Sequence, residues 1–170
     1  MSGEREHGIH QSRVIVGTHD SVAGLQALRR GIDEARRRDA TVYLVRAVNA
    51  PARNPGGALW HTEWAVWAAE YAQLALVTAL GGIPRDVEVR TVVLEGAAGP
   101  ALVDFADRED DLLVVGDAQR RGLRRPWSGR VARYCARRAS CPVLVVPPPA
   151  LSRVDGHDLA RELQRLVDAA

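Results

Sequence analysis

The chain contains 170 residues, of which 46% are hydrophobic and 26% are charged, and its formal net charge is +2. This composition is typical of one soluble globular domain, and no apolar stretch approaches the roughly 18 residues that a membrane-spanning helix needs. All 23 basic side chains are arginine. Because a Walker-type phosphate loop and a Schiff-base enzyme each need a lysine amine, the sequence excludes both classes.

Residues 1–12 are polar and lack the basic start and apolar centre of a signal peptide. We therefore expect a mobile N-terminal tail and a cytoplasmic protein. Cys135 and Cys141 are too few for a disulfide framework, and their spacing fits no zinc signature. We expect neither a metal site nor thiol chemistry.

Four short, continuous runs rich in β-branched residues predict strands that are buried on both faces, at 14–16, 42–45, 112–115 and 143–146. A fifth strand, with a more alternating pattern, is predicted at 87–94.

Segments with helical periodicity lie between these strands. In the first helix, which Ser21 should cap, the apolar residues are Val22, Leu25, Leu28, Ile32 and Ala35. In the second helix they are Trp64, Trp67, Tyr71 and Leu74. Such three- and four-residue intervals place side chains on one helix face. Trp60 joins Trp64 and Trp67 as a residue expected in the core or an interface. Further helices are predicted at 97–106 and 129–138.

This alternation predicts an α/β fold, a doubly wound, five-stranded parallel sheet of the Rossmann-like or flavodoxin-like type with strand order 3-2-1-4-5. Ligands of such sheets bind where strand order reverses, beyond the carboxyl ends of the strands. The loops at 17–21 and 116–128 should therefore face one crevice. We expect the domain to span 13–149 and a C-terminal helical extension, 150–170, to follow it. The apolar stripe of that helix contains Leu159, Leu163, Leu166 and Val167.

Two stretches carry a family resemblance. They are Val-Ile-Val-Gly-Thr-His-Asp-Ser at 14–21, and the segment from Asp111 to Val146 that ends in Cys-Pro-Val-Leu-Val-Val. Over residues 13–147 the chain resembles the universal stress protein family. The resemblance implies a crevice for ATP or another adenine nucleotide, slow ATP hydrolysis at most, a role in stress response, and a homodimer paired through the last strand, Pro142 to Val146.

The chain departs from the family motif at three positions. Gly116 and Gly129 match it, but Gln119 replaces the second motif glycine, and Arg130 replaces a serine or threonine. His19 stands where the family has an aspartate. Because glutamine restricts the loop and a histidine cannot act as a charged acceptor for ribose hydroxyls, we expect inefficient ATP binding.

These comparisons define a candidate crevice and a group of anion contacts. The crevice residues are Gly17, His19, Ala47, Gly116, Gln119, Gly129, Arg130 and Val131, and the candidate anion contacts are Arg120, Arg121, Arg124 and Arg125. No second histidine or nucleophile has a spacing that completes a catalytic set with His19, so we expect it to line the site without catalysing. In the 129–138 helix, Arg130, Arg133 and Arg137 should share the outer face, whereas Val131 and Cys135 should point inward.

Three functions remain open at this stage. The preferred one is a non-catalytic binding or regulatory protein whose crevice is empty or takes a small anionic ligand. The second is an adenine-nucleotide-binding protein with slow ATP hydrolysis. The third is an adaptor that binds an acidic partner or a nucleic acid through the arginine-rich loop, although this segment lacks the interleaved aromatics of nucleic-acid readers.

Overall fold

The computed structural model describes residues 11–19, 21–48, 58–117 and 129–149. The elements in chain order are β1 (Arg13–Gly17), α1 (Val22–Arg38), β2 (Thr41–Val48), α2 (Ala58–Leu80), β3 (Val89–Glu95), α3 (Ala98–Phe105), β4 (Leu112–Gly116), α4 (Arg130–Arg138) and β5 (Val143–Val146). The predicted alternation of strands and helices is confirmed. Residues 1–10 and 150–170 lie outside the described part, so the tail, the last helix and the domain limits stay predictions.

The strands form one parallel sheet in the order β3-β2-β1-β4-β5, as the sequence predicts. Strand β1 is central: its Val16 lies beside Leu44 of β2 and Val114 of β4. All three side chains are buried. Continuous apolar strands of this kind form because helices cover both faces of a doubly wound sheet.

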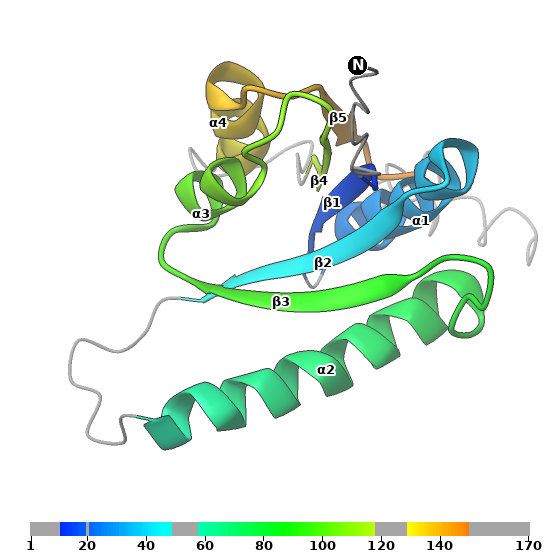
Figure 1. Ribbon diagram of the computed structural model, residues 1–170, viewed down its shortest axis with the longest axis vertical. Coiled ribbons are helices and arrows are strands. Elements are labelled where there is room, and N and C mark those ends of the chain that lie inside the picture. The colour runs from blue at the N-terminus through cyan, green and yellow to red at the C-terminus, as the bar shows by residue number, and fades with distance from the viewer. Residues whose placement is uncertain (1–10, 20, 49–57, 118–128, 150–170) are drawn as a thin grey trace, which may run out of the picture.

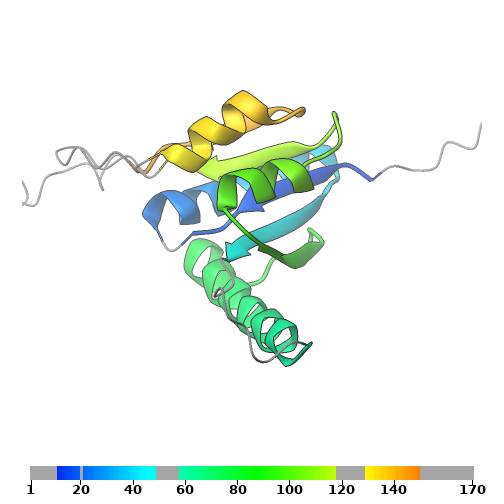
Figure 2. The same cartoon turned by 90° about the vertical axis from the view of Figure 1, so that its left-hand side faces the viewer.

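The helices form one layer on each face of the sheet (Figures 1 and 2). Helices α1 and α2 pack against each other on one face, and α3 and α4 pack together on the other. Val14, Leu28, Leu44 and Leu76 belong to the core of the first layer. A second core, which includes Leu113, lies beneath α3 and α4.

Helix α1 begins as predicted. The Ser21 hydroxyl accepts a hydrogen bond of 3.0 Å from the backbone N–H of Gly24, and Leu28, Ile32 and Ala35 are buried. The prediction for Val22 is wrong, because this side chain is half exposed. Six residues separate it from Leu28, which places it about 120° round the helix from the buried stripe.

The predicted apolar stripe of α2 is wrong at Trp67 and Leu74, which are exposed, whereas Tyr71 is half-buried and packs against the core. The buried residues are Ala72, Ala75, Leu76 and Ala79. Small alanines let the helix approach α1 and β3 closely, so the largest side chains do not mark the inward face. The side chains of Trp60 and Trp64 lie outside the described residues.

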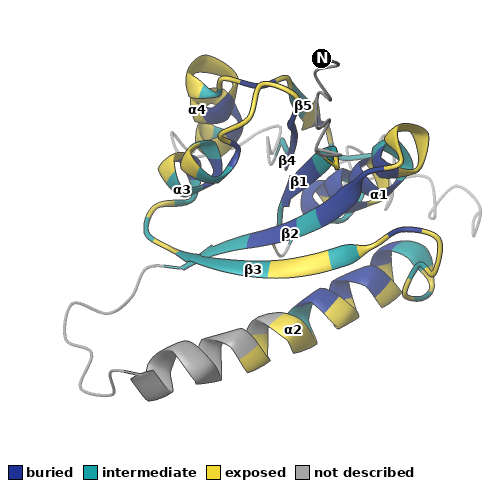
Figure 3. Ribbon diagram, in the orientation of Figure 1, coloured by how far each residue is buried: buried dark blue, intermediate teal, exposed yellow. Residues whose placement is uncertain are grey.

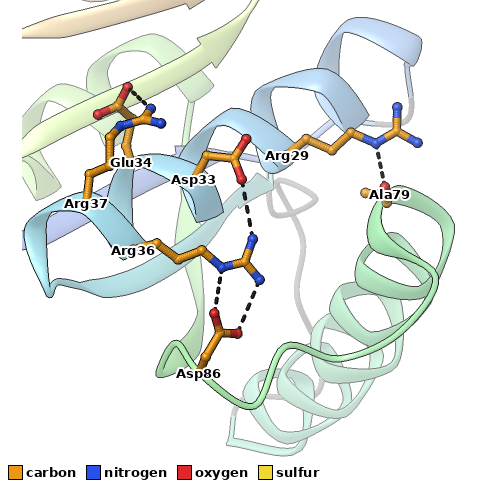
Figure 4. Close-up of polar contacts among 7 residues, drawn as sticks. All are labelled: Arg29, Asp33, Glu34, Arg36, Arg37, Ala79 and Asp86. Carbon is orange, nitrogen blue, oxygen red and sulfur yellow. Dashed lines mark hydrogen bonds and ion pairs between the residues drawn. The ribbon is translucent and has the colours of Figure 1, made fainter.

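Arginines of α1 attach it to the C-terminal end of α2 and to the loop that follows (Figure 4). Arg29 Nε donates to the carbonyl of Ala79, which is one of the last carbonyls of α2 and has no partner within the helix. Arg36 donates to both carboxylate oxygens of Asp86, at 2.6 and 3.2 Å. These hydrogen bonds hold the pKa of Asp86 below its usual value.

The amino ends of β1 and β4 are held together by a buried ion pair. Arg13 donates to both carboxylate oxygens of Asp111, from Nε at 2.7 Å and from Nη2 at 2.5 Å. Asp111 is fully buried and also accepts the backbone N–H of Arg108 at 3.1 Å. The hydrogen bond to Asp111 raises the pKa of Arg13, which therefore stays charged.

Candidate functional site

A cavity of about 230 Å³ opens beyond the carboxyl ends of β1 and β4, where strand order reverses. The loop after β1 is fixed at its edge, because the backbone N–H and the hydroxyl of Thr18 both donate to the carbonyl of Val45, at 2.9 and 3.1 Å. The lining comes from the ends of β1, β2 and β4, from the first turns of α1 and α4, and from the first two turns of α3. It consists of Gly17, Thr18, His19, Ser21, Gly24, Val45, Arg46, Ala47, Ala98, Leu102, Val115, Gly116, Gly129, Arg130, Val131 and Ala132.

The structure places most of the predicted crevice residues around this cavity. Gly17, His19, Ala47, Gly116, Gly129, Arg130 and Val131 all line it. Gln119 and the four predicted anion contacts, Arg120, Arg121, Arg124 and Arg125, lie outside the described residues. Sequence reasoning did not single out the other lining residues, among them Arg46, Ala98 and Leu102. Arg46 was recognisable in principle, because it directly precedes Ala47 at the carboxyl end of β2.

Gly116 is required by packing as well as by its place in the motif. A Cβ at this position would come within 2.7 Å of the backbone of Ala23 and 2.9 Å of the nitrogen of Gly24. Gly24 is equally constrained, since a Cβ there would lie 2.3 Å from the carbonyl oxygen of His19. Contacts this short cannot be made by a real side chain. The close approach of β4 to α1 therefore explains Gly116 without a ligand.

The first turn of α4 forms another wall of the cavity. Gly129 caps this helix with a left-handed backbone, φ 74°, which favours glycine. The prediction that Val131 points inward is wrong, because its side chain is 37% exposed. Cys135 is buried as predicted, and Ala132, three residues before it, takes the place of Val131 on the face that packs on the sheet.

The cavity is lined by cationic and neutral side chains. Arg46 and Arg130 contribute guanidinium groups and His19 an imidazole, and none of the described lining residues carries a carboxylate. The first turns of α1 and α4 add the partial positive charge of helix N-termini. This arrangement favours an anion over a cation. Arg46 is held at the β2 end by aromatic faces, with its guanidinium carbon 4.2 Å from the ring centroid of Tyr71 and 4.9 Å from that of Trp67.

The cysteines lie away from this lining. Cys135 and Cys141 are buried and unpaired with each other. Burial raises the pKa of the Cys135 thiol to about 11 and also raises the pKa of Cys141. Because the thiolate is the reactive form, both are poor nucleophiles near neutral pH. Among the described residues, no three histidine, cysteine or acidic side chains gather where they could hold a metal ion.

The fold and the crevice together define the class: a doubly wound α/β protein with a small, positively charged cavity at its topological switch point. The model of the universal stress protein family matches residues 11–147. The chain belongs to the universal stress protein family. Within the described residues, no helix is both long and apolar enough to cross a membrane.

Individual relatives agree with this assignment. A universal stress protein of Methanocaldococcus jannaschii is 29% identical over 140 residues, which cover 81% of this chain and 82% of the relative. One from Mycobacterium tuberculosis is 26% identical over 148 residues, and the chain spans only 48% of its length. A solved universal stress protein in complex with cAMP superposes with a TM-score of 0.62 at 28% identity, covering 81% of this chain and 98% of the other.

Proposed function

We propose that this protein binds a small anionic ligand in the crevice and does not turn it over. The observation that carries the proposal is the lining, in which Arg46, Arg130 and His19 face a cavity of about 230 Å³ without a carboxylate among the described residues. A phosphate group fits such a site, because guanidinium groups bind phosphate through charge-assisted hydrogen bonds.

An adenine nucleotide with a short phosphate group is the first candidate ligand. The cavity is smaller than the roughly 300–1,000 Å³ of typical ligand pockets, which suits a nucleoside monophosphate better than the triphosphate ATP. The structural neighbour in complex with cAMP, at 28% identity, also supports a nucleoside monophosphate. Gly116, which the family motif connects with phosphate binding, has a packing reason of its own and adds no support for ATP.

The proposed absence of turnover rests on the chemistry of the same side chains. Hydrolysis of ATP needs a group that positions the attacking water and oxygen ligands for Mg²⁺. The described lining offers His19 and two hydroxyls but no carboxylate for either task. The proposed role is that of a binding or regulatory protein without turnover. We further propose that it acts in the cytoplasm, in the stress response.

Titration calorimetry tests this proposal. We expect AMP and cAMP to bind more tightly than ATP, and Arg130→Ser to weaken AMP binding by about tenfold, the loss of one charge-assisted hydrogen bond. Arg133→Ser, an exposed arginine on the same helix but outside the lining, is the matched control. Tight ATP binding with steady phosphate release would replace the proposal with the nucleotide-hydrolysing alternative.

The exposed arginines of α4 favour a second candidate function. Arg130, Arg133, Arg137 and Arg138 are exposed, and the helix contains no acidic residue. This surface would bind an acidic partner or a nucleic acid through its charge. Binding of duplex DNA or RNA whose affinity falls steeply with salt would support this adaptor function, and no binding at low salt would remove it.

We also retain the proposal of a homodimer formed through β5. In the described sheet β5 pairs only with β4, which leaves its other edge available for a second strand. Val145→Glu should disrupt such pairing, since this side chain is partly exposed at the edge. Light scattering would detect the change, and an unchanged mass for this variant would count against the β5 dimer.

A further inference from the structure

Arg46 connects the crevice to a helix that contributes no described residue to its lining. Arg46 lines the cavity at the end of β2, and its guanidinium carbon lies 4.2 Å from the ring centroid of Tyr71 and 4.9 Å from that of Trp67. Both rings belong to α2, and none of the described lining residues does. The position of a crevice arginine therefore depends on α2.

The two rings form a platform that is ordered before any ligand binds. Trp67 and Tyr71 are four residues apart on α2, so they lie on the same side of the helix. Their rings stack with centroids 5.7 Å apart and an interplanar angle of 22°. Tyr71 packs against the first core, and Figure 3 shows α2 buried on the side that is turned toward β3. The core thus fixes Tyr71, and Tyr71 orients the partly exposed Trp67.

The pleat of β2 directs Arg46 toward this platform. Leu44 belongs to the core beneath α1 and α2, whereas Val45 belongs to the core beneath α3 and α4. Because side chains alternate along a strand, Arg46 projects to the same side as Leu44. Arg130 lines the cavity from α4, in the opposite layer. The two arginines of the described lining therefore approach the cavity from opposite layers of the fold.

A guanidinium group that stacks on aromatic rings can still bind an anion. A ring attracts the flat face of the cation when the cation lies within about 6 Å of the ring centroid, whereas the N–H donors point outward in the guanidinium plane. Stacking and hydrogen bonding to an anion are therefore compatible. An arginine that is held before the ligand arrives also loses less side-chain freedom on binding, which raises the affinity.

We propose that Trp67 and Tyr71 are positioning residues of the crevice, which hold the Arg46 guanidinium where it binds the anionic group of the ligand. This role rests on the proposed anion-binding function and adds two determinants of affinity that lie outside the lining. It gives the exposed ring of Trp67 a function in the binding site in place of the core packing that the sequence predicts. The affinity of the crevice for a phosphate group then depends on the aromatic rings of α2.

Replacing each ring with and without loss of aromatic character tests this role. Trp67→Leu and Tyr71→Leu should each weaken AMP binding in titration calorimetry by about fivefold, the loss of one cation–π contact. Trp67→Phe and Tyr71→Phe keep a ring face and should lose less than about twofold. Leu74→Ala, at an exposed position of the same helix, is the matched control and should bind AMP like the natural chain. Equal losses for the leucine and phenylalanine variants would overturn the proposal.

A double-mutant cycle separates positioning from a purely structural role of Trp67. Arg46→Gln should weaken AMP binding by about tenfold, and Trp67→Leu should have no further effect in that background, because the ring acts through Arg46. The same loss in both backgrounds would refute the positioning role while leaving the anion-binding crevice intact. A natural chain that binds no AMP would remove the anion-binding function and this inference with it, so the two failures are distinguishable.

Discussion

The two ends of β1 and β4 differ in how completely their polar groups are satisfied. At the amino ends, Arg13 and Asp111 form a buried pair with two hydrogen bonds, and the backbone of Arg108 adds a third. At the carboxyl ends of the same strands, Gly17 and Gly116 border a cavity instead. Buried polar groups whose hydrogen bonds are satisfied stabilise a fold, whereas an open cavity lined by positively charged side chains can bind a ligand.

From this difference we expect the amino ends of β1 and β4 to contribute to stability and their carboxyl ends to contribute to ligand binding. The amino end contains the buried ion pair of Arg13 and Asp111, and neither residue lines the crevice. Substitutions there should change the free energy of unfolding without changing ligand affinity. Substitutions at the carboxyl ends should change ligand affinity with little effect on stability. The exception is a glycine such as Gly116, which the packing of α1 requires.

Replacing Arg13 should have the largest effect on stability. Arg13→Ala leaves the Asp111 carboxylate buried without its charged partner, and we expect a loss of about 3–5 kcal/mol in the free energy of unfolding. Urea denaturation measures it. Arg90→Ala, which breaks an ion pair with Glu88 at the surface, is the control and should change stability far less. Similar losses for both variants would refute the central role of the buried pair.

The Cys135 thiol makes the core sensitive to alkaline pH. Burial raises its pKa from 9.0 to about 11 in the folded state. The contribution to stability is complete below about pH 9 and is lost as the pH rises through 11, because the unfolded chain releases the proton first. Two pKa units correspond to at most about 3 kcal/mol.

The difference in free energy of unfolding between the natural chain and Cys135→Ala separates the contribution of this thiol from those of other titrating groups. Denaturation of both proteins between about pH 8 and pH 11 should show their free energies of unfolding converging as the pH rises. A constant difference across this range would mean that the thiol does not titrate as expected.

Gly116 tests whether the crevice edge is set by packing. Gly116→Ala places a Cβ against the backbone of Ala23, and we expect it to cost about 1–3 kcal/mol even without ligand. Gly82→Ala is the matched control, since a Cβ there meets nothing within 4 Å. Thermal denaturation of the two variants should show a lower melting temperature for Gly116→Ala than for Gly82→Ala. A fully stable Gly116→Ala protein that has lost only ligand binding would show that the glycine serves the ligand.

The sequence predicted the sheet and the position of the crevice well, because both depend on local patterns. The β-branched runs around Val16 and Val114 indicated buried strands, and the alternation with helices then restricted the strand order. Gly17, His19, Ala47 and Gly116 line the cavity because they lie at or just after strand ends, and Gly129, Arg130 and Val131 line it from the start of α4.

The helix faces were harder to predict. In α2 the large side chains suggested a buried stripe through Leu74, yet alanines face the core. In α4 the buried face passes through Ala132 and not Val131. The error in α2 arises because hydrophobic size indicates burial only when a helix has one apolar side. In α4, Val131 lines the cavity and does not pack in the core. The packing role of Gly116 depends on the position of α1, which no local pattern contains.

Nuclear magnetic resonance of the protein titrated with AMP tests the division between the two strand ends most directly. We expect amide shifts to concentrate at crevice residues, with Gly17, His19 and Arg130 among them, and to be small at Arg13 and Asp111. Shifts at the amino ends, shifts confined to the outer face of α4, or none at millimolar AMP would contradict an anion-binding crevice.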